Sequence, residues 1–185
     1  MDDLQAIRRM KRGDIGGLEV LVARYQTRAV RTAYLITHDE QLAEDVAQET
    51  FVQVYQRIGQ FDELRPFQPY FLRSVANAAL NAVQKDSKCD PVGLDSDVAL
   101  LDALFTQAMT IETQVEYRQL KQEVASRLAS LPPRQRAAIV LRYYLEMSEK
   151  EMAESLTTPP GTVKWLLNTA RESLRELLGS ERSAE

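Results

Sequence analysis

LPPRQRAAIVLRYYLEMSEKEMAESLTTPPGTVKWLLNTARESLREL, residues 131–177, is the stretch that decides the fold class of the chain. Its two leading prolines end one helix, expected over residues 113–130, and open the next, expected over residues 134–145, because proline is tolerated in the first turn of a helix but not in its interior. Ser148 and Glu151 form a capping-box pattern, which begins a short helix. A Thr-Thr-Pro-Pro turn, residues 157–160, then leads into a longer helix that closes at Gly179. The short helix, the tight turn and the longer helix together predict a helix-turn-helix.

The longer helix of this pair has an apolar face and a polar face. Val163, Leu167 and Ala170 recur at helical spacing, which predicts that they pack on the shorter helix. The opposite face carries residue types that read DNA: asparagine pairs with adenine, threonine or tryptophan contacts a thymine methyl, and flanking cations hold phosphates. A helical hairpin with a solvated outer face is the alternative that this pattern leaves open. The residues on the outer face and its flank are Lys164, Trp165, Asn168, Thr169, Arg171, Glu172 and Arg175.

The N-terminal part of the chain predicts a second helical domain. Apolar residues at helical spacing indicate a long helix over residues 14–37. Asp39 is the expected N-cap of the next helix, which closes near Gly59. Pro66 or Pro69 begins a further helix. With a short leading helix, we expect four helices in this domain.

Residues 88–115 differ in charge from both helical parts. They contain one lysine and five acidic residues, together with a proline and a glycine, and this composition indicates a linker. Within them, residues 98–105 are apolar enough to form a short docked helix, with a binding element as the alternative. The predicted fold class is all-α, with two small helical domains, residues 1–87 and 116–185, joined by a flexible acidic linker. The helix-turn-helix belongs to the C-terminal domain.

Composition excludes several classes of function. The 185 residues include 23 Lys+Arg and 27 Asp+Glu, and the formal net charge of −4 predicts weak binding to free duplex DNA. The single cysteine, Cys89, excludes an internal disulfide and a cysteine-based zinc site, and the single histidine, His38, excludes an HExxH motif. We therefore expect no enzyme, no cofactor and no metal. Since no run approaches the ~18 apolar residues of a membrane span and no secretory signal is present, we expect a cytoplasmic protein without membrane insertion.

Three segments resemble bacterial extracytoplasmic-function sigma factors. Residues 131–177 are similar to the C-terminal domain of that family through Leu-Pro, Arg-Gln-Arg, Gly-Thr-Val-Lys and Ala-Arg. AEDVAQETFVQVYQRIGQF, residues 43–61, and PYFLRSVAN, residues 69–77, resemble two signatures of its N-terminal domain. The resemblance implies a protein that binds the clamp and flap of RNA polymerase core and directs it to promoter DNA. It also implies an anti-sigma factor as a further partner.

The resemblance also implies which residues carry these contacts. A helix that docks on the polymerase clamp would present Asp45, Gln48, Glu49, Phe51 and Val52. The loop at residues 60–67 and the helix after it would engage the minus-ten element and capture an unstacked base of the non-template strand. The minus-ten residues would be Phe61, Phe67, Tyr70, Arg73 and Asn77, although each aromatic ring fits a place in the domain core equally well. The minus-thirty-five residues would be Ser148, Thr162, Lys164, Trp165, Asn168, Thr169 and Arg171.

The sequence departs from the family pattern in the recognition helix. Leu166 and Thr169 stand where the family often has arginine, so that several phosphate contacts are missing. An activator or another DNA-bound recruiter is therefore an open hypothesis. One rival interpretation is a sigma-like interaction module or decoy, which binds an anti-sigma protein or polymerase without initiating. A second is a stand-alone helix-turn-helix repressor, which the net negative charge disfavours.

Overall fold

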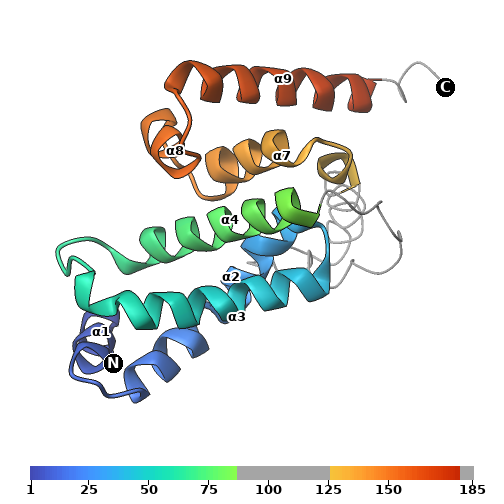
Figure 1. Cartoon of the computed structure of the whole chain (residues 1–185). Coiled ribbons are helices and arrows are strands. Elements are labelled where there is room, and N and C mark those ends of the chain that lie inside the picture. Colours follow the sequence, from blue (N-terminus) through green and yellow to red (C-terminus); the bar gives the residue numbers. More distant parts are fainter. Residues whose placement is uncertain (87–125, 180–185) are drawn as a thin grey trace, which may run out of the picture.

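The computed structural model describes residues 1–86 and 126–179, and every regular element in these two ranges is helical (Figure 1). This confirms the predicted all-α class. The N-terminal group consists of α1 (Asp3–Lys11), α2 (Gly16–Thr37), α3 (Glu40–Arg57), the 3-10 turn η1 (Ile58–Gln60) and α4 (Phe67–Asp86). The C-terminal group consists of α7 (Pro133–Ile139), the π-helical turn η2 (Val140–Tyr144), α8 (Glu149–Ser155) and α9 (Pro160–Gly179).

Side-chain caps set several of the helix starts. The Asp39 carboxylate accepts a hydrogen bond from the Leu42 backbone N–H, which confirms Asp39 as the N-cap of α3. The expected start of the long helix at residue 14 is two residues early. Gly13 has a φ of 84°, and the Asp14 carboxylate accepts from the Gly16 N–H, so that the chain turns before α2 begins.

The helix expected over residues 134–145 is confirmed in its extent, but its second half, Val140–Tyr144, is π-helical and not α-helical. The α-helix ends at Ile139, and the next turn is widened, because the Leu145 N–H donates to the Val140 carbonyl over a distance of 3.0 Å. Glu146 follows with a φ of 54°, a left-handed conformation that reverses the chain before α8.

Aromatic rings form the centre of the N-terminal group. Phe71, which is fully buried, has its ring centroid 4.4 Å from that of Phe51 and 5.6 Å from that of Phe67. Tyr25 contributes a fourth ring from α2, with its centroid 5.7 Å from that of Phe67. This cluster joins α2, α3 and α4, because each ring buries a large apolar area and pairs with its neighbours in tilted or stacked geometry.

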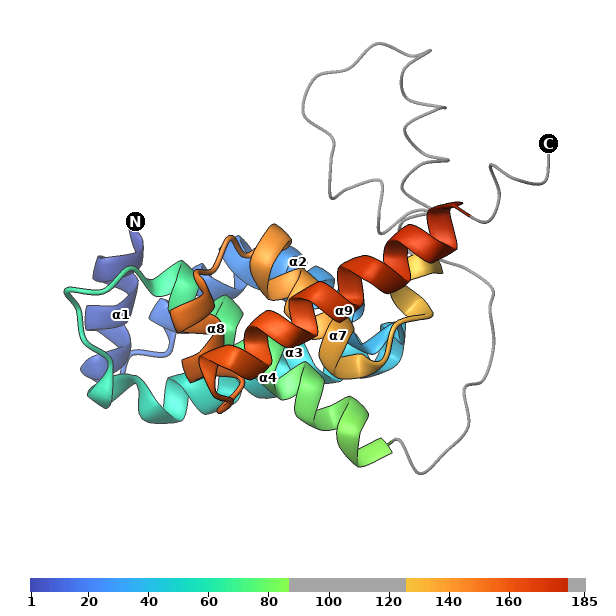
Figure 2. The ribbon, with the colours of Figure 1, turned by 90° about the horizontal axis from the view of Figure 1, so that it is seen from above.

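The C-terminal group packs directly on the N-terminal group. In Figures 1 and 2, α7 lies between α9 and the pair formed by α2 and α4, and α7 contacts both members of that pair. Tyr144 faces α2, where the Arg28 guanidinium lies 6.0 Å from the centre of its ring. Burial raises the pKa of the Tyr144 phenol, and the positive charges of Arg28 and Arg31 oppose that shift. The predicted linker, Cys89 and most of a helix expected over residues 113–130 lie outside the described residues.

Candidate polymerase and nucleic-acid interfaces

The surface of α3 presents most of the predicted polymerase set. Asp45, Gln48 and Glu49 are exposed, and Val52 is 50% exposed. These four residues follow one another at helical spacing, so that they share one face. Phe51 does not lie on this face, which corrects the predicted set, because its ring is 6% exposed and packs on the aromatic cluster of the core. A partner on this surface therefore meets two carboxylates, an amide and one apolar side chain.

The predicted minus-ten aromatics do not share one environment. Phe61 and Phe67 are buried, with 7% and 3% of their surface exposed, and they belong to the core as the alternative interpretation expected. Both still line a cavity of about 440 Å³ between α1, α2 and the loop after η1. Tyr70 is 36% exposed, and its ring centroid lies 4.9 Å from that of Phe61. The surface available to a base is thus Tyr70 and the mouth of this cavity.

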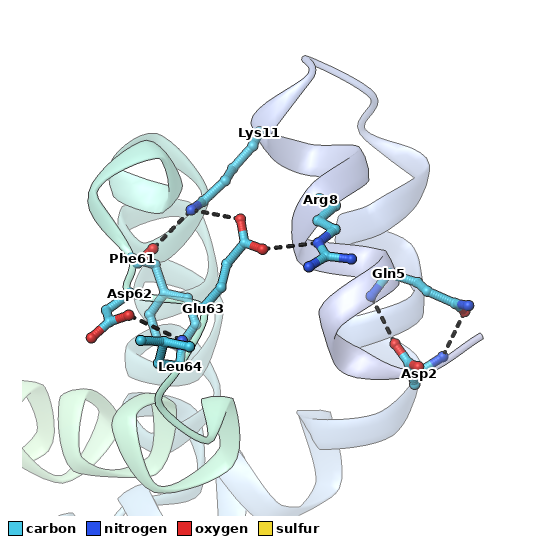
Figure 3. Close-up of polar contacts among 8 residues, drawn as sticks. All are labelled: Asp2, Gln5, Arg8, Lys11, Phe61, Asp62, Glu63 and Leu64. Carbon is cyan, nitrogen blue, oxygen red and sulfur yellow. Dashed lines mark hydrogen bonds and ion pairs between the residues drawn. The ribbon is translucent and has the colours of Figure 1, made fainter.

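Charged groups of α1 hold the loop that follows η1 (Figure 3). Glu63 accepts from Arg8 Nε at 2.8 Å and from Lys11 Nζ at 3.0 Å. Lys11 Nζ also donates to the backbone carbonyl of Phe61 at 2.8 Å. Hydrogen bonds from the two cations lower the pKa of the Glu63 carboxyl. Leu64, the next residue, is 94% exposed.

The remaining two minus-ten residues lie under α8. Arg73 Nη2 is 3.3 Å from Glu151 Oε1, and Ser155 Oγ donates to Asn77 Oδ1 at 2.7 Å. Glu151 also accepts from the backbone N–H and hydroxyl of Ser148 through its other oxygen, so that it completes the predicted capping box. One carboxylate therefore caps the first helix of the helix-turn-helix and contacts the N-terminal group.

The helix-turn-helix presents an open outer row on α9. Lys164 and Asn168 are exposed, and Trp165 is 58% exposed, while Thr162 and Thr169 are half-buried. On the inner side, Val163, Leu166, Leu167 and Ala170 are buried against the rest of the group. Leu166 therefore fills the core, which explains why an apolar residue is accommodated at a position where the family often has arginine.

Arg171 is engaged within the fold. Its Nε donates to the Tyr143 hydroxyl at 2.8 Å, and its guanidinium carbon lies 5.7 Å from the centre of that ring. A weaker contact of 3.4 Å joins Arg171 Nη1 to Asn168 Oδ1. In this conformation, Tyr143 fixes the arginine beside Asn168 on the flank of the recognition helix.

Sequence reasoning missed the polar contacts between distant helices. Arg8 and Lys11 lie three residues apart on α1, which places them on one face, but no motif links them to a carboxylate more than 50 residues away. Among the described residues, no group of three or more histidine, cysteine or acidic side chains is placed to hold a metal ion. In the same part of the chain, no helix combines the length and the hydropathy of a membrane span.

Comparisons with known proteins match both groups of helices. The model of the family "Sigma-70 region 2" matches residues 21–89, and that of "Sigma-70, region 4" matches residues 121–174. Similar curated proteins include the ECF RNA polymerase sigma factor SigW of Bacillus subtilis, which is 30% identical over 93% of this chain and 94% of its own length. The RNA polymerase sigma-H factor of Pseudomonas aeruginosa is 31% identical over 95% of this chain and 93% of its own.

Two solved structures share the fold. CnrH, solved in complex with the cytosolic domain of CnrY, has a TM-score of 0.62 and 24% identity, covering 96% of this chain and 97% of that one. RpoE of Bartonella quintana, solved with the anti-sigma factor NepR, has a TM-score of 0.58 and 20% identity, covering 87% of this chain and 96% of that one.

Proposed function

Since the chain belongs to the extracytoplasmic-function sigma factors of the sigma-70 family, we propose that it binds bacterial RNA polymerase core and directs promoter-specific initiation of transcription. The division into a polymerase-docking and minus-ten domain, residues 1–87, an acidic linker, residues 88–115, and a minus-thirty-five domain, residues 116–185, is part of this proposal. So are a cytoplasmic location and the absence of catalysis by the chain itself.

The observation that carries the proposal is the exposed face of α3. Asp45 and Glu49 stand one helical turn apart, with Gln48 beside them and an exposed Val52 at the end. Two carboxylates around an apolar contact suit a partner surface that is basic at its rim and apolar at its centre, as in many protein–protein interfaces. Within the described residues this face is exposed, although the C-terminal group covers part of α4.

Promoter recognition is assigned to two further surfaces. Lys164, Trp165 and Asn168 on α9 would enter the major groove of the minus-thirty-five element, where asparagine can pair with adenine and lysine can hold a phosphate. Tyr70 and the cavity beside it would receive an unstacked base of the minus-ten element, because an aromatic face supports a base by stacking. The net charge of −4 fits a factor whose affinity for DNA comes chiefly through polymerase.

An anti-sigma factor is a further proposed partner. RpoE of Bartonella quintana, which shares this fold, was solved with the anti-sigma factor NepR. An activator that recruits the holoenzyme belongs to the proposal as well, because Leu166 is buried and leaves α9 with few cations to hold phosphates.

Transcription with purified components tests the proposed function. Core polymerase and the full chain are incubated with genomic DNA, and the transcripts are sequenced to locate their start sites. We expect starts that require the chain and share one bipartite element. Binding to core without a transcript would identify a decoy, and specific binding to duplex DNA without polymerase would identify a repressor. Either result would refute the proposal.

A further inference from the structure

We infer that Arg8, Lys11 and Glu63 are positioning residues for promoter recognition, through which α1 fixes the loop between η1 and α4 in the shape that selects a minus-ten base. This inference rests on the proposed function of the chain as a sigma factor. It adds a role for the N-terminal helix, which no sequence motif of the chain assigned to DNA.

The contacts from α1 hold the loop at two points that lie two residues apart. Lys11 donates to the Phe61 carbonyl at the start of the loop and to the Glu63 carboxylate two residues later. Arg8 holds the other oxygen of the same carboxylate at 2.8 Å. Both oxygens of Glu63 are therefore bound to cations on one face of α1, and both α1 and the loop lie at the same end of the helical bundle (Figures 1 and 3).

The contacts of Arg8 and Lys11 with Glu63 and the Phe61 carbonyl are called the brace below. The loop also has hydrogen bonds of its own, which the brace supplements. Asp62 Oδ1 accepts from the Leu64 N–H at 3.0 Å, and Arg65 N–H donates to the Asp62 carbonyl at 3.1 Å. These bonds form a tight turn, but they leave the turn free to rotate against the rest of the domain. The contacts of Glu63 with α1 remove that freedom, because they join the turn to a helix whose own position is fixed.

The fixed turn has a surface suited to a base. It presents Leu64, with 94% of its surface exposed, while the flanking residues Glu63 and Arg65 line the cavity described above. Apolar side chains at such positions contact unstacked bases, and a pocket that is ordered before binding loses less conformational entropy when the base enters. A turn held in one position distinguishes bases by shape, whereas a mobile turn adapts to several.

The brace is separable from the packing of α1. Ile7 and Met10 are buried, with 2% and 3% of their surface exposed, and α1 packs on α2, where the backbone of Gly17 lies against Met10. Asp3 adds contacts with Arg24 and with the Tyr25 hydroxyl. Loss of the brace should therefore leave the helix in place and loosen only the turn.

A charge swap tests the inference with the full chain and polymerase core. The readout is run-off transcription from a set of promoters that together carry every single-base change in the minus-ten element. Base preference is the ratio of the transcript yield with the preferred base to the yield with the other bases. The double variant Arg8→Glu with Lys11→Glu repels Glu63, and we expect the ratio to fall about fivefold, the order expected for the loss of two exposed ion pairs. Adding Glu63→Arg restores attraction and should restore the ratio.

A matched control lies on the same helix. Arg9 forms an ion pair of 2.7 Å with Asp14 and does not contact the loop, so Arg9→Glu should leave the ratio unchanged. Glu63→Gln, which keeps the size of the side chain, serves as a second variant if the double variant is unstable. Core binding, measured in parallel, should not change in any of them.

The outcomes separate the inference from the proposed function. An unchanged base preference in the double variant would overturn the inference. A loss that Glu63→Arg does not restore would also overturn it, because the α1 cations would then act on DNA phosphates directly. If the wild-type chain supports no promoter-specific transcript, the proposed function fails, and the inference falls with it.

Discussion

Replacing Gly17 by alanine tests the closest approach between α1 and α2. A Cβ atom at Gly17 would lie 2.3 Å from the backbone carbonyl oxygen of Ala6 and 2.7 Å from Met10 Cγ. Cβ atoms in proteins do not approach other heavy atoms within 3.0 Å, so α1 has to shift by about 0.7 Å from the carbonyl contact alone. The carbonyl belongs to a helix and cannot rotate away as a side chain would.

The magnitude follows from two opposing effects. Overpacking of this kind costs about 1–3 kcal/mol. Alanine gains up to about 1 kcal/mol over glycine within a helix, which offsets part of the strain. We therefore expect the free energy of unfolding to fall by about 1–2 kcal/mol, which corresponds to a fall in Tm of about 2–8 °C for a chain of this size.

Thermal and urea unfolding followed by circular dichroism provide the measurement. Gly161, in the first turn of α9, is the matched control, because a Cβ atom there would meet nothing within 4 Å. Gly161→Ala should be neutral or slightly stabilising. If Gly17→Ala unfolds with a free energy within 0.5 kcal/mol of the wild type, roughly the scatter of neutral surface changes, then α1 does not pack on α2 as described.

The remaining predictions concern the charged surfaces. Replacing Asp45 and Glu49 by lysine should weaken core binding by more than the ~0–1 kcal/mol of one exposed ion pair, and unchanged affinity in a pull-down titration would place the docking face elsewhere. Replacing Lys164 and Asn168 by alanine should reduce dependence on the minus-thirty-five element while core binding stays constant, and an unaltered set of start sites would contradict the placement of α9 in the groove. Because hydrogen bonds from two α1 cations lower the pKa of the Glu63 carboxyl below its ordinary value, its contribution to stability is present above that ordinary value and is lost as the pH falls through the lowered pKa. Unfolding measured from pH 7 to pH 3 should show a shallower loss in Glu63→Gln, and identical pH profiles would show that the carboxylate is not held.

Local chemistry made several elements predictable. Asp39 and the Ser148–Glu151 pair cap helices through their own neighbours, so that residues three apart carried the whole signal. The start of α7 at Pro133 follows from the same kind of local constraint. The exposed acidic face of α3 was also predictable, because its residues recur at helical spacing in the sequence.

The left-handed backbone conformations of two residues in turns escaped prediction because neither residue is glycine. Glu146 and Thr157 adopt φ values of 54° and 48°, a region that glycine normally occupies, and Thr157 is β-branched as well. Phe51 was misplaced for a different reason. Phe51 entered the polymerase set through the family resemblance, whereas its helical spacing from Val46 and Val54 already places its ring on the buried side of α3. The contacts of α1 with Glu63 likewise depend on tertiary structure.

The contact of α8 with α4 has a consequence for the order of events at a promoter. If α4 binds the minus-ten strand as proposed, that strand cannot reach Arg73 and Asn77 until the helix-turn-helix moves away, because both residues contact α8. The ion pair is partly exposed and worth about 0–1 kcal/mol, and the hydrogen bond adds about 0.5–1.5 kcal/mol. These two bonds are weak, but α7 also packs on α2 and α4, so a polymerase that separates the halves of the chain has to break both sets of contacts. The free chain would keep its two halves together and separate them only on the enzyme. It would therefore not bind DNA in the cell in the absence of polymerase.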